Sequence, residues 1–207
     1  MTRVKVCGIT GADDAQMAAD MGAAAVGFIF YPGSRRHIEP SAAGRAASVL
    51  PSKVVKAGVF VNQDIGFIVS AAETAGLDLV QVHGDETPEF CKGIPVPYMK
   101  AVRVKNRDSL KEIDLYDSNF VLLDTFADRQ FGGTGRVFDW DLLNNLDLKG
   151  KNLFLSGGLN SNNVAAAVKA ARPYAVDVCS GVEKKAGVKD PEKLRLFMEE
   201  VQIADTA

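Results

Sequence analysis

Short apolar runs alternate with longer amphipathic segments along the whole chain. The runs are rich in β-branched residues and several are almost continuously apolar, which is typical of parallel strands buried on both faces. We expect strands at Arg3–Cys7, Ala24–Phe30, Val54–Val61, Leu77–Val82, Tyr98–Val104, Phe120–Asp124, Asn152–Leu155 and Tyr174–Val178. We expect helices between them at Asp13–Met21, Ser41–Leu50, Asp64–Ala75, Thr87–Cys91, Asn106–Ile113, Val137–Leu146, Ser161–Ala170 and Pro191–Val201.

The residues at the ends of these segments support the predicted helices. Gly22 and Gly76 each follow a helical pattern, where glycine commonly adopts a left-handed conformation that ends a helix. Asp190 precedes Pro191, and proline is tolerated at the first position of a helix. Ser161 precedes another apolar-periodic stretch and is a candidate for its N-cap.

Strict alternation of eight strands with eight helices predicts a parallel sheet with right-handed crossovers. A doubly wound open sheet is the competing architecture, but the first strand-to-helix turn, 7–11, lacks a G-x-G-x-x-G fingerprint. No linker rich in Pro, Gly or Ser divides the chain. We therefore predict an α/β fold, a single (β/α)8 or TIM barrel over residues 1–207, with its chemistry on the loops that follow the strands.

Composition excludes several classes of function. The 207 residues carry 24 Lys and Arg against 26 Asp and Glu, a net charge of −2, so nothing favours nucleic acid or a membrane surface as a partner. No apolar run of about 18 residues predicts a membrane span, and no signal peptide is evident. Three cysteines without a C-x-x-C pair, and only two histidines, argue against a zinc cluster. Reduced thiols in the cytoplasm are expected.

Two glycine-bearing segments follow the last two predicted strands. Ser156-Gly157-Gly158 follows the seventh strand and leads into a helix, and Ser180-Gly181 follows the eighth. Glycines let backbone N–H groups approach an anion closely, and a helix N-terminus adds favourable partial charge. A glycine pair alone is also compatible with a simple tight turn. The matching positions of the two segments favour the phosphate site that recurs in such barrels.

A thiol and a carboxyl group stand at the ends of two other strands. Cys7 closes the first strand, and a thiolate is a competent general base, although a lone strand-end cysteine is more often core. Asp124 ends an apolar run, where desolvation favours the acid form and suits a general acid. The alternative for Asp124 is a capping role in the segment that follows.

Further polar residues lie at other strand exits. Arg36 follows the second strand and its planar fork suits a carboxylate, although Arg35 and Arg36 also fit a solvated basic loop. Gln81 and His83 alternate along the fourth strand, so both are expected to face the barrel interior; a lone histidine there is commonly structural. The glycine-dense segment Gly132–Gly135 fits a lid or a merely flexible connection.

These pieces, in this order, resemble the phosphoribosylanthranilate isomerase family of tryptophan biosynthesis. The resemblance runs from end to end of the chain, and the ordered set is far more specific than any one glycine pair. The matching stretches are 5–10, 27–32, Ser34-x-Arg36, 58–62, 80–84, 122–125, Gly132-Gly133-Thr134-Gly135-x-x-Phe138-Asp139-Trp140, 155–160 and Val176-Asp177-Val178-x-Ser180-Gly181-Val182-Glu183.

The resemblance implies a barrel enzyme that performs an Amadori rearrangement of N-(5-phosphoribosyl)anthranilate to the corresponding 1-deoxyribulose 5-phosphate. By the same resemblance Cys7 is the general base and Asp124 the general acid. Arg36 matches the arginine that holds the anthranilate carboxylate. The remaining expected substrate-binding residues are Gln81, His83, Gly157, Gly158, Asp177, Ser180 and Gly181.

The implied chemistry needs neither metal nor organic cofactor, because an imine formed on the substrate serves as the electron sink. The expected partner is a small phosphorylated substrate, and the chain is expected to act as a monomer or a homodimer. Asp177 precedes the phosphate cradle at a position suited to orient its loop or a sugar hydroxyl. One departure from the family is Cys179, which stands where many members carry serine.

Three alternatives remain at this point. Another phosphate-binding barrel, such as an indoleglycerol-phosphate synthase, would use a strand-end lysine, and the chain has Lys5 and Lys100 in its strands. A sugar-phosphate epimerase with a histidine metal site is disfavoured, since His37 and His83 are the only histidines. A non-catalytic sensor of a phosphorylated metabolite would have no use for an acid and a base across one pocket.

Overall fold

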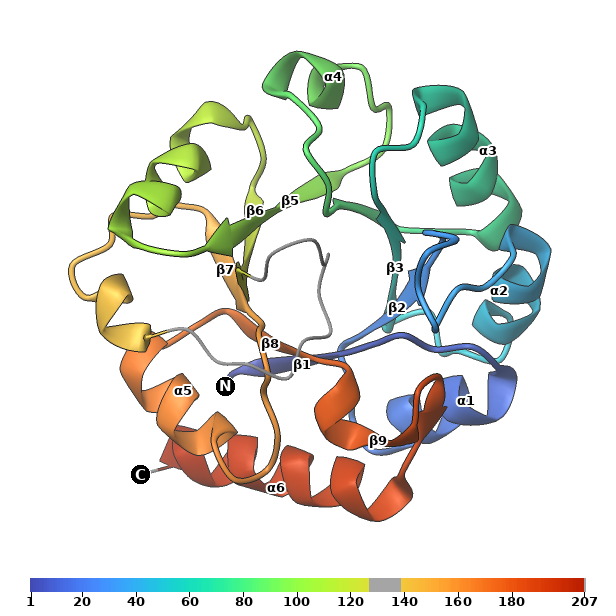
Figure 1. Cartoon of the computed structure of the whole chain (residues 1–207). Helices are drawn as coiled ribbons and strands as arrows, with labels where there is room; N and C mark the ends of the chain where they lie inside the picture. The colour runs from blue at the N-terminus through green and yellow to red at the C-terminus, as the bar shows by residue number, and fades with distance from the viewer. Residues whose placement is uncertain (127–138, 207) are drawn as a thin grey trace.

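The computed structural model describes residues 1–126 and 139–206. Within these residues, eight parallel strands form one closed barrel in which each strand pairs with its sequence neighbour and β8 pairs with β1 (Figure 1). The predicted barrel is therefore confirmed. The strands are β1 (Arg3–Cys7), β2 (Ala25–Ile29), β3 (Val55–Phe60), β4 (Leu79–Val82), β5 (Tyr98–Val104), β6 (Phe120–Thr125), β7 (Asn152–Leu155) and β8 (Ala175–Val178).

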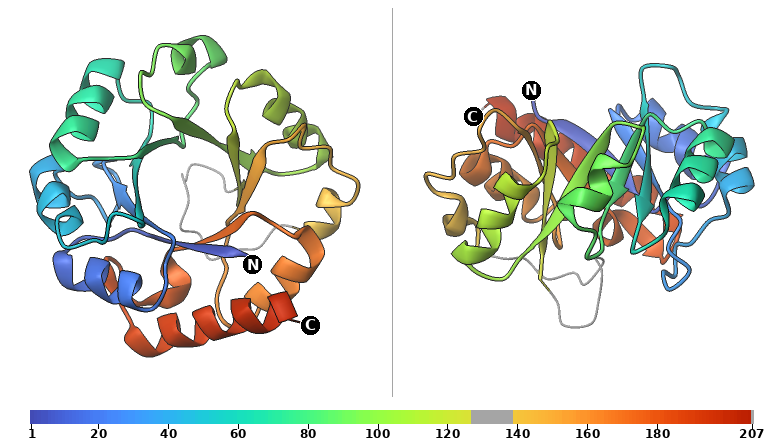
Figure 2. Two further views of the ribbon diagram at one scale, coloured as in Figure 1. Left: turned by 180° about the vertical axis from the view of Figure 1, so that it is seen from behind. Right: turned by 90° about the horizontal axis from the view of Figure 1, so that it is seen from above.

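Helices surround the barrel and cover the outer face of the sheet, as the views from both ends show (Figures 1 and 2). The α-helices are α1 (Ala12–Asp20), α2 (Pro40–Ala47), α3 (Ile65–Ala75), α4 (Pro88–Lys92), α5 (Val164–Ala171) and α6 (Pro191–Thr206). Shorter 3-10 helices are η1 (Arg107–Leu115), η2 (Trp140–Leu143) and η3 (Ser180–Val182). A two-stranded antiparallel hairpin, β9 (Glu183–Lys185) and β10 (Val188–Lys189), follows β8.

The apolar residues form two separate cores because each strand is covered on both faces. The larger core fills the layer between the strands and the helices, and includes Val6, Phe28 and Leu123. The smaller core lies inside the barrel and consists of Ala57, Leu79, Met99, Ala101, Leu122, Phe154 and Ala175. Toward the C-terminal ends of the strands, the inward positions beyond this inner core include the buried polar residues Gln81, Asp124 and Asp177, which belong to the site described below.

The ends of several helices agree with the predicted signals. Gly22 and Gly76 have φ angles of 95° and 61°, in the left-handed region that glycine tolerates at a helix end. Asp190 accepts hydrogen bonds from the backbone nitrogens of residues 192 and 193 at the start of α6. Ser161, by contrast, does not begin its helix, because 161–163 form a turn and α5 begins at Val164.

Two predicted helices differ in type from the expectation. The segment predicted as Asn106–Ile113 is the 3-10 helix η1, which Asn106 and Ser109 cap reciprocally. Of the predicted Val137–Leu146, residues 137 and 138 lie outside the described residues and the following part contains the 3-10 helix η2. No helix within the described part of the chain is long and apolar enough to cross a membrane.

Candidate active site

Cys7 lies at the C-terminal end of β1 and faces the inside of the barrel. Its neighbour on the same face is Lys5, whose side chain is fully buried. Gly27 on β2 leaves room for both, since a Cβ atom there would lie 2.7 Å from the Cys7 Sγ and 3.2 Å from the Lys5 Nζ. The thiol is thus held in a tight space that a larger residue at position 27 would fill.

Asp124 lies on β6 at the same end of the barrel, and it is buried with 5% of its surface exposed. Its Oδ2 atom is 3.1 Å from Nε2 of His83, and Nδ1 of that ring is 2.8 Å from the side-chain nitrogen of Gln81. Because the Gln81 amide donates to Nδ1, the ring proton sits on Nε2 and is donated to Asp124. The expected inward orientation of Gln81 and His83 is confirmed, and both act on the carboxylate of β6.

The closed barrel brings Cys7 and Asp124 to one rim. In the ring order β6-β7-β8-β1 only two strands separate them, and both residues occupy the C-terminal ends of their strands. Those two intervening strands lead into the glycine segments after β7 and β8. The thiol, the carboxylate and both glycine segments therefore share one sector of the rim.

The two glycine segments contact each other. Gly157 and Gly158 have φ angles of 95° and 63°, a conformation that other residues rarely adopt. A Cβ atom on Gly157 would collide with the side chain of Thr125, next to Asp124. A Cβ atom on Gly181 would collide with the backbone carbonyl of Leu159. At Gly157 and Gly181 the packing leaves no space for a side chain, so the two backbones form one compact wall.

Ser180 begins the short helix η3 and is partly exposed, so its hydroxyl is available on this wall. Asp177 lies three residues earlier, on β8. Its side chain is buried inside the barrel, where its Oδ1 lies 2.8 Å from the Lys5 Nζ. Lys5 and Asp177 also face each other in the strand register. Asp177 therefore orients the lysine beneath the thiol in this structure, and it lies below the glycine loops.

The electrostatic surroundings of Cys7 favour its thiolate. A hydrogen bond with the Cys179 thiol, opposed by burial and assisted by the positive charges of Lys5 and Lys189, lowers the pKa of Cys7 to about 6. The same contact, together with burial, raises the pKa of Cys179 well above its ordinary value. The ammonium of Lys5, although desolvated, has a raised pKa because Asp177 and Cys7 stabilise its charge.

Arg36 reaches the site from the loop after β2, and its fork is engaged by Glu183. The two hydrogen bonds run from Nε to Oε1, 2.8 Å, and from Nη2 to Oε2, 2.6 Å. A Cβ atom on Gly8 would lie 2.7 Å from the Arg36 Cδ, so the arginine passes directly over the residue after Cys7. Glu183 thus fixes the guanidinium beside the thiol, with its third nitrogen, Nη1, outside this bidentate pair.

Lys189 connects the ends of β1 and β8 and was not identified from the sequence. Its buried ammonium donates to the backbone carbonyls of Cys7, 2.6 Å, and Cys179, 3.3 Å, and lies 3.1 Å from Glu183. The Glu183 carboxylate also accepts from the backbone nitrogen of Gly187. The only sequence signal for this network was the position of Glu183 within the Ser180–Glu183 motif.

Lys5 and Lys100, the two strand lysines that an indoleglycerol-phosphate synthase could use, are both engaged in other contacts. Lys5 is ion-paired with Asp177 below the rim. Lys100 is buried and donates to the carbonyl of Gly84, 2.7 Å, and to Glu86, 2.9 Å, where it stabilises the turn after β4. Neither ammonium is presented at the mouth of the barrel, where a synthase of that kind would need one.

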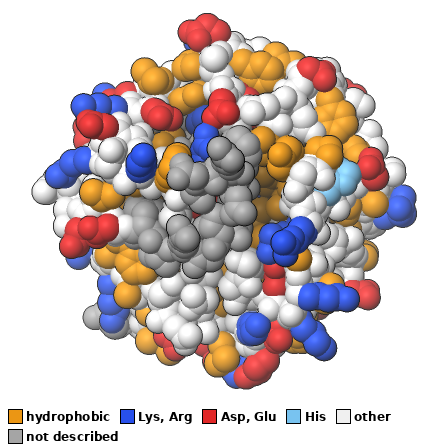
Figure 3. Space-filling model, viewed as in Figure 1, with side chains coloured by type: hydrophobic (Ala, Val, Ile, Leu, Met, Phe, Trp, Pro, Cys, Tyr) orange, Lys and Arg blue, Asp and Glu red, His pale blue; other side chains and the backbone are white. Residues whose placement is uncertain are grey.

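Other predicted features fall outside this sector or outside the described residues. The proposed lid Gly132–Gly135 belongs to 127–138, which the structure does not describe. Among the described residues, no group of three His, Cys, Asp or Glu side chains is placed to hold a metal ion. On the face that carries the site, acidic and basic side chains are interspersed around the rim (Figure 3).

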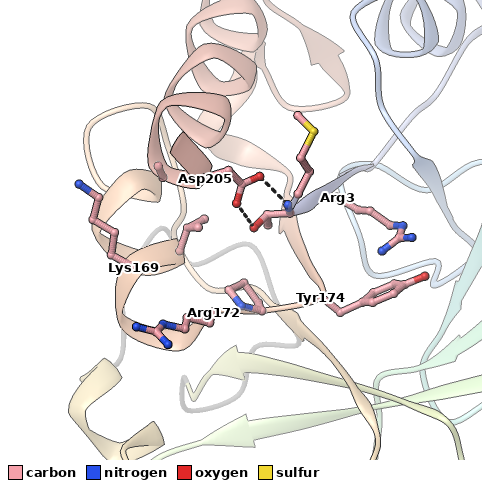
Figure 4. A pocket seen from close by; sticks show the side chains of 10 residues that line it. Arg3, Lys169, Arg172, Tyr174 and Asp205 are labelled. Carbon is pink, nitrogen blue, oxygen red and sulfur yellow. Dashed lines mark hydrogen bonds between the residues drawn. The ribbon is translucent and has the colours of Figure 1, made fainter. Parts of the chain in front are cut away.

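A hollow of about 510 Å³ lies at the opposite end of the molecule, around the starts of β1 and β8 and the ends of α5 and α6. Its walls include Arg3, Lys169, Arg172, Tyr174 and Asp205 (Figure 4). Asp205 accepts hydrogen bonds from the backbone nitrogen and the hydroxyl of Thr2, and the Arg3 guanidinium stacks 4.2 Å from the Tyr174 ring centre. The Thr2–Asp205 hydrogen bonds join the start of the chain to the last helix, and the hollow is remote from Cys7 and Asp124.

Comparison with known proteins gives one consistent answer. Residues 4–200 match the family model described as N-(5'phosphoribosyl)anthranilate (PRA) isomerase. An N-(5'-phosphoribosyl)anthranilate isomerase from Nitrosospira multiformis is 46% identical over 207 residues, covering 99% of this chain and 98% of the relative. The enzyme of the same name from Nitrosomonas eutropha is 47% identical over 203 residues, covering 97% and 96%.

Solved structures agree. The phosphoribosyl anthranilate isomerase of Thermotoga maritima superposes with a TM-score of 0.91 at 40% identity, covering 98% of this chain and 99% of that one. A phosphoribosyl anthranilate isomerase in complex with reduced 1-(o-carboxyphenylamino)-1-deoxyribulose 5-phosphate gives a TM-score of 0.88 at 40% identity, with the same coverage. On its fold, its sequence and the residues gathered at the barrel rim, this chain belongs to the N-(5'-phosphoribosyl)anthranilate isomerase family.

Proposed function

We propose that this chain isomerises N-(5'-phosphoribosyl)anthranilate by general acid–base catalysis, with Cys7 as the base and Asp124 as the acid. The observation that carries the proposal is the placement of the Cys7 thiol and the buried, histidine-bound carboxyl group of Asp124 on one sector of the barrel rim. The lowered pKa of Cys7 agrees with its role as the base. The family relationship supplies the substrate, since relatives covering the whole chain bear this name.

The reaction begins at the furanose ring. Asp124 acts in its protonated form: it delivers its carboxyl proton to the ring oxygen and becomes a carboxylate, the C1–O bond breaks, and the anthranilate nitrogen forms an iminium with C1. His83 and Gln81 act through Asp124, because their hydrogen-bond chain fixes the carboxylate in one orientation. The role proposed for these two residues is thus to position the acid at the substrate.

Proton transfer at the sugar C2 follows. The iminium withdraws electrons and makes the C2 hydrogen acidic, and the Cys7 thiolate removes it to give an enolamine. Protonation at C1 and loss of the hydroxyl proton at C2 then yield the ketone. Lys5 and Lys189 support the thiolate by their positive charge, while the burial of Cys7 keeps it from being solvated.

Two anchors hold the substrate on either side of the reacting carbons. We assign the phosphate to the wall formed by Gly157, Gly158, Ser180 and Gly181, whose backbone N–H groups and hydroxyl suit an anion. We assign the anthranilate carboxylate to Arg36, whose free edge extends past the Glu183 pair. Asp177 contributes through Lys5, by holding the ammonium below the thiol.

The test is direct turnover. Phosphoribosylanthranilate is generated in solution and its fluorescence is followed after addition of the purified chain, with the product identified by the ¹³C signal of its new C2 ketone. We expect the fluorescence to fall and the ketone to appear. A folded preparation that leaves the substrate unchanged rejects the proposal.

We also infer that the protein works in a reducing cellular compartment and has a low oligomeric state. A catalytic thiolate must stay reduced, which favours the cytoplasm. A Thermotoga maritima relative is described as a dimeric enzyme from which monomers were generated, and we expect this chain to be a monomer or a homodimer. Sedimentation velocity over a tenfold concentration range distinguishes the two.

A further inference from the structure

Two cysteines lie at the ends of neighbouring strands at the active-site rim: Cys7 is the last residue of β1, and Cys179 directly follows β8. In the register of β1 and β8, Lys5 pairs with Asp177 and Val6 with Val178, so Cys7 and Cys179 occupy the next matched positions. Neighbouring strands lie about 4.8 Å apart. A disulfide spans Cα separations of about 4.4–6.8 Å, so this backbone spacing suits a cross-link.

The two side chains also face each other. Each thiol shifts the pKa of the other, and the Cys179 Sγ lies 3.9 Å from the Oε1 atom of Glu183, the carboxylate that also accepts from Lys189 beside Cys7. A Cβ atom on Gly8 would lie 2.8 Å from the Cys179 Sγ, so that sulfur rests against the residue that follows Cys7. Gly27 leaves matching space beside the Cys7 Sγ. Because Gly8 and Gly27 have no side chains, neither residue blocks the approach of the two sulfurs.

The two thiols differ in their electrostatic surroundings. The pKa of Cys7 is lowered by its contact with Cys179 and by the positive charges of Lys5 and Lys189, which favours Cys7 as the nucleophile, whereas the pKa of Cys179 is raised by the same contact and its side chain is partly exposed. The third cysteine, Cys91, lies buried on α4, and burial raises its pKa to about 11. Oxidation should therefore begin at Cys7, with Cys91 as an unreactive internal reference.

We propose that Cys7 and Cys179 form an oxidative modification site, in which a hydroperoxide converts the active-site thiol into a reversible Cys7–Cys179 disulfide. The Cys7 thiolate attacks a peroxide oxygen, the O–O bond breaks, and the leaving oxygen takes a proton, which gives a sulfenic acid. The Cys179 sulfur, losing its proton, then displaces the hydroxyl as water. Two thiols lose two electrons to the peroxide, and a dithiol reductant returns them.

The functional consequence rests on the proposed isomerase. A disulfide removes the thiolate that acts as base, so turnover stops while the cross-link persists. It also protects Cys7, because a sulfenic acid with no partner thiol oxidises further to a sulfinic acid that dithiols do not reduce. Cysteine at 179, where the resemblance leads one to expect serine, thus confers recoverable inhibition in place of permanent loss.

The experiment uses the full chain treated with hydrogen peroxide, alkylated, digested with trypsin and examined by mass spectrometry. Trypsin places the three cysteines in separate peptides, 6–35, 57–92 and 170–184. We expect peptide 6–35 joined to 170–184 and lighter by two hydrogens, while 57–92 stays alkylated. Isomerase activity should fall by about 10²-fold or more as the cross-link accumulates, and dithiothreitol should restore it.

Cys179→Ser is the diagnostic variant, compared with its own untreated sample. We expect peroxide to convert its Cys7 to sulfinic acid, with activity that dithiothreitol does not restore. Cys91→Ser is the matched control and should behave as the unmodified chain does. Sulfinic acid on Cys7 of the unmodified chain without any cross-linked peptide overturns the inference, and so does full recovery of the oxidised Cys179→Ser variant.

The mass measurement needs no turnover, so the two proposals fail separately. A cross-link in a chain without isomerase activity rejects the proposed function and leaves the modification site standing. Turnover in a chain that forms no cross-link rejects only the modification site.

Discussion

The Nε2 atom of His83 lies 3.1 Å from the Oδ2 atom of Asp124, which joins β4 to β6 at the rim of the barrel. Gln81 holds the other ring nitrogen at 2.8 Å, so the histidine cannot rotate without losing a hydrogen bond. A carboxylate fixed in this way presents one defined orientation to a substrate. The chain across the two strands is therefore the device that positions the proposed acid.

Replacing His83 with Asn should reduce kcat more than it changes KM. The variant loses a hydrogen bond to the carboxylate that Asp124 becomes as it gives up its proton, and hydrogen bonds to charged groups contribute about 1.5–3 kcal/mol, so we expect a loss of about 10- to 100-fold in kcat. Steady-state kinetics with phosphoribosylanthranilate make the comparison. A raised KM with unchanged kcat would instead make His83 a direct substrate-binding residue.

The pH dependence of kcat/KM should have an acid limb near pH 6. Cys7 is a base only as its thiolate, and its pKa is lowered to about 6, so on the acid side activity rises with pH through that value. At pH 5 we expect about a tenth of the plateau rate. Cys179→Ala removes the hydrogen bond that is the largest cause of the lowered pKa and should move this limb to higher pH. A limb near pH 8.5 in the unmodified chain contradicts the account.

Gly157→Ala should raise KM by disrupting the phosphate wall. The new methyl group would collide with Thr125, and the left-handed backbone at position 157 would be strained as well. Gly150→Ala is the matched control, because Gly150 has a similar φ of 81° but open space around its Cβ position. We expect at least a tenfold rise in KM for the first variant only. Equal effects in both variants would show that backbone strain alone is responsible.

Glu183→Gln should destabilise the fold and disorder Arg36. Glu183 is buried and engages both Arg36 and Lys189, so the substitution leaves two cations without their carboxylate. Breaking a buried pair costs about 3–5 kcal/mol, measurable as a lower urea midpoint. Burial alone would raise the pKa of Glu183, but the hydrogen bond from Arg36 and the charge of Lys189 lower it below its ordinary value. The stability that the Glu183 carboxylate contributes is therefore fully present above the pKa of the unfolded chain, and it is lost as the pH falls through the pKa of the folded chain.

Glu192→Gln, which removes an exposed helical pair with Arg195, is the control and should change the midpoint little. Equal midpoints for the two variants would contradict the stabilising role of Glu183.

The barrel strands were predictable because each is a short apolar run, and their ends placed Cys7 and Asp124 at one rim. The inward orientation of Gln81 and His83 followed from the two-residue period of a strand. The hydrogen bond from His83 to Asp124 did not, because it joins residues 41 positions apart. The hairpin of β9 and β10 was missed because its strands are two or three residues long and mostly polar. Lys189 on β10 was missed for the same reason, and its contacts with Cys7, Cys179 and Glu183 form only when the barrel closes.

The most direct test compares single turnovers of phosphoribosylanthranilate by the unmodified chain, Cys7→Ser and Asp124→Asn. Circular dichroism and urea midpoints first establish that the variants are folded. We predict that the unmodified chain consumes the substrate and that each variant is slower by about 10²–10⁴-fold, the usual contribution of a general acid or base. A folded variant that turns substrate over at nearly the unmodified rate would contradict the role of the residue it replaces.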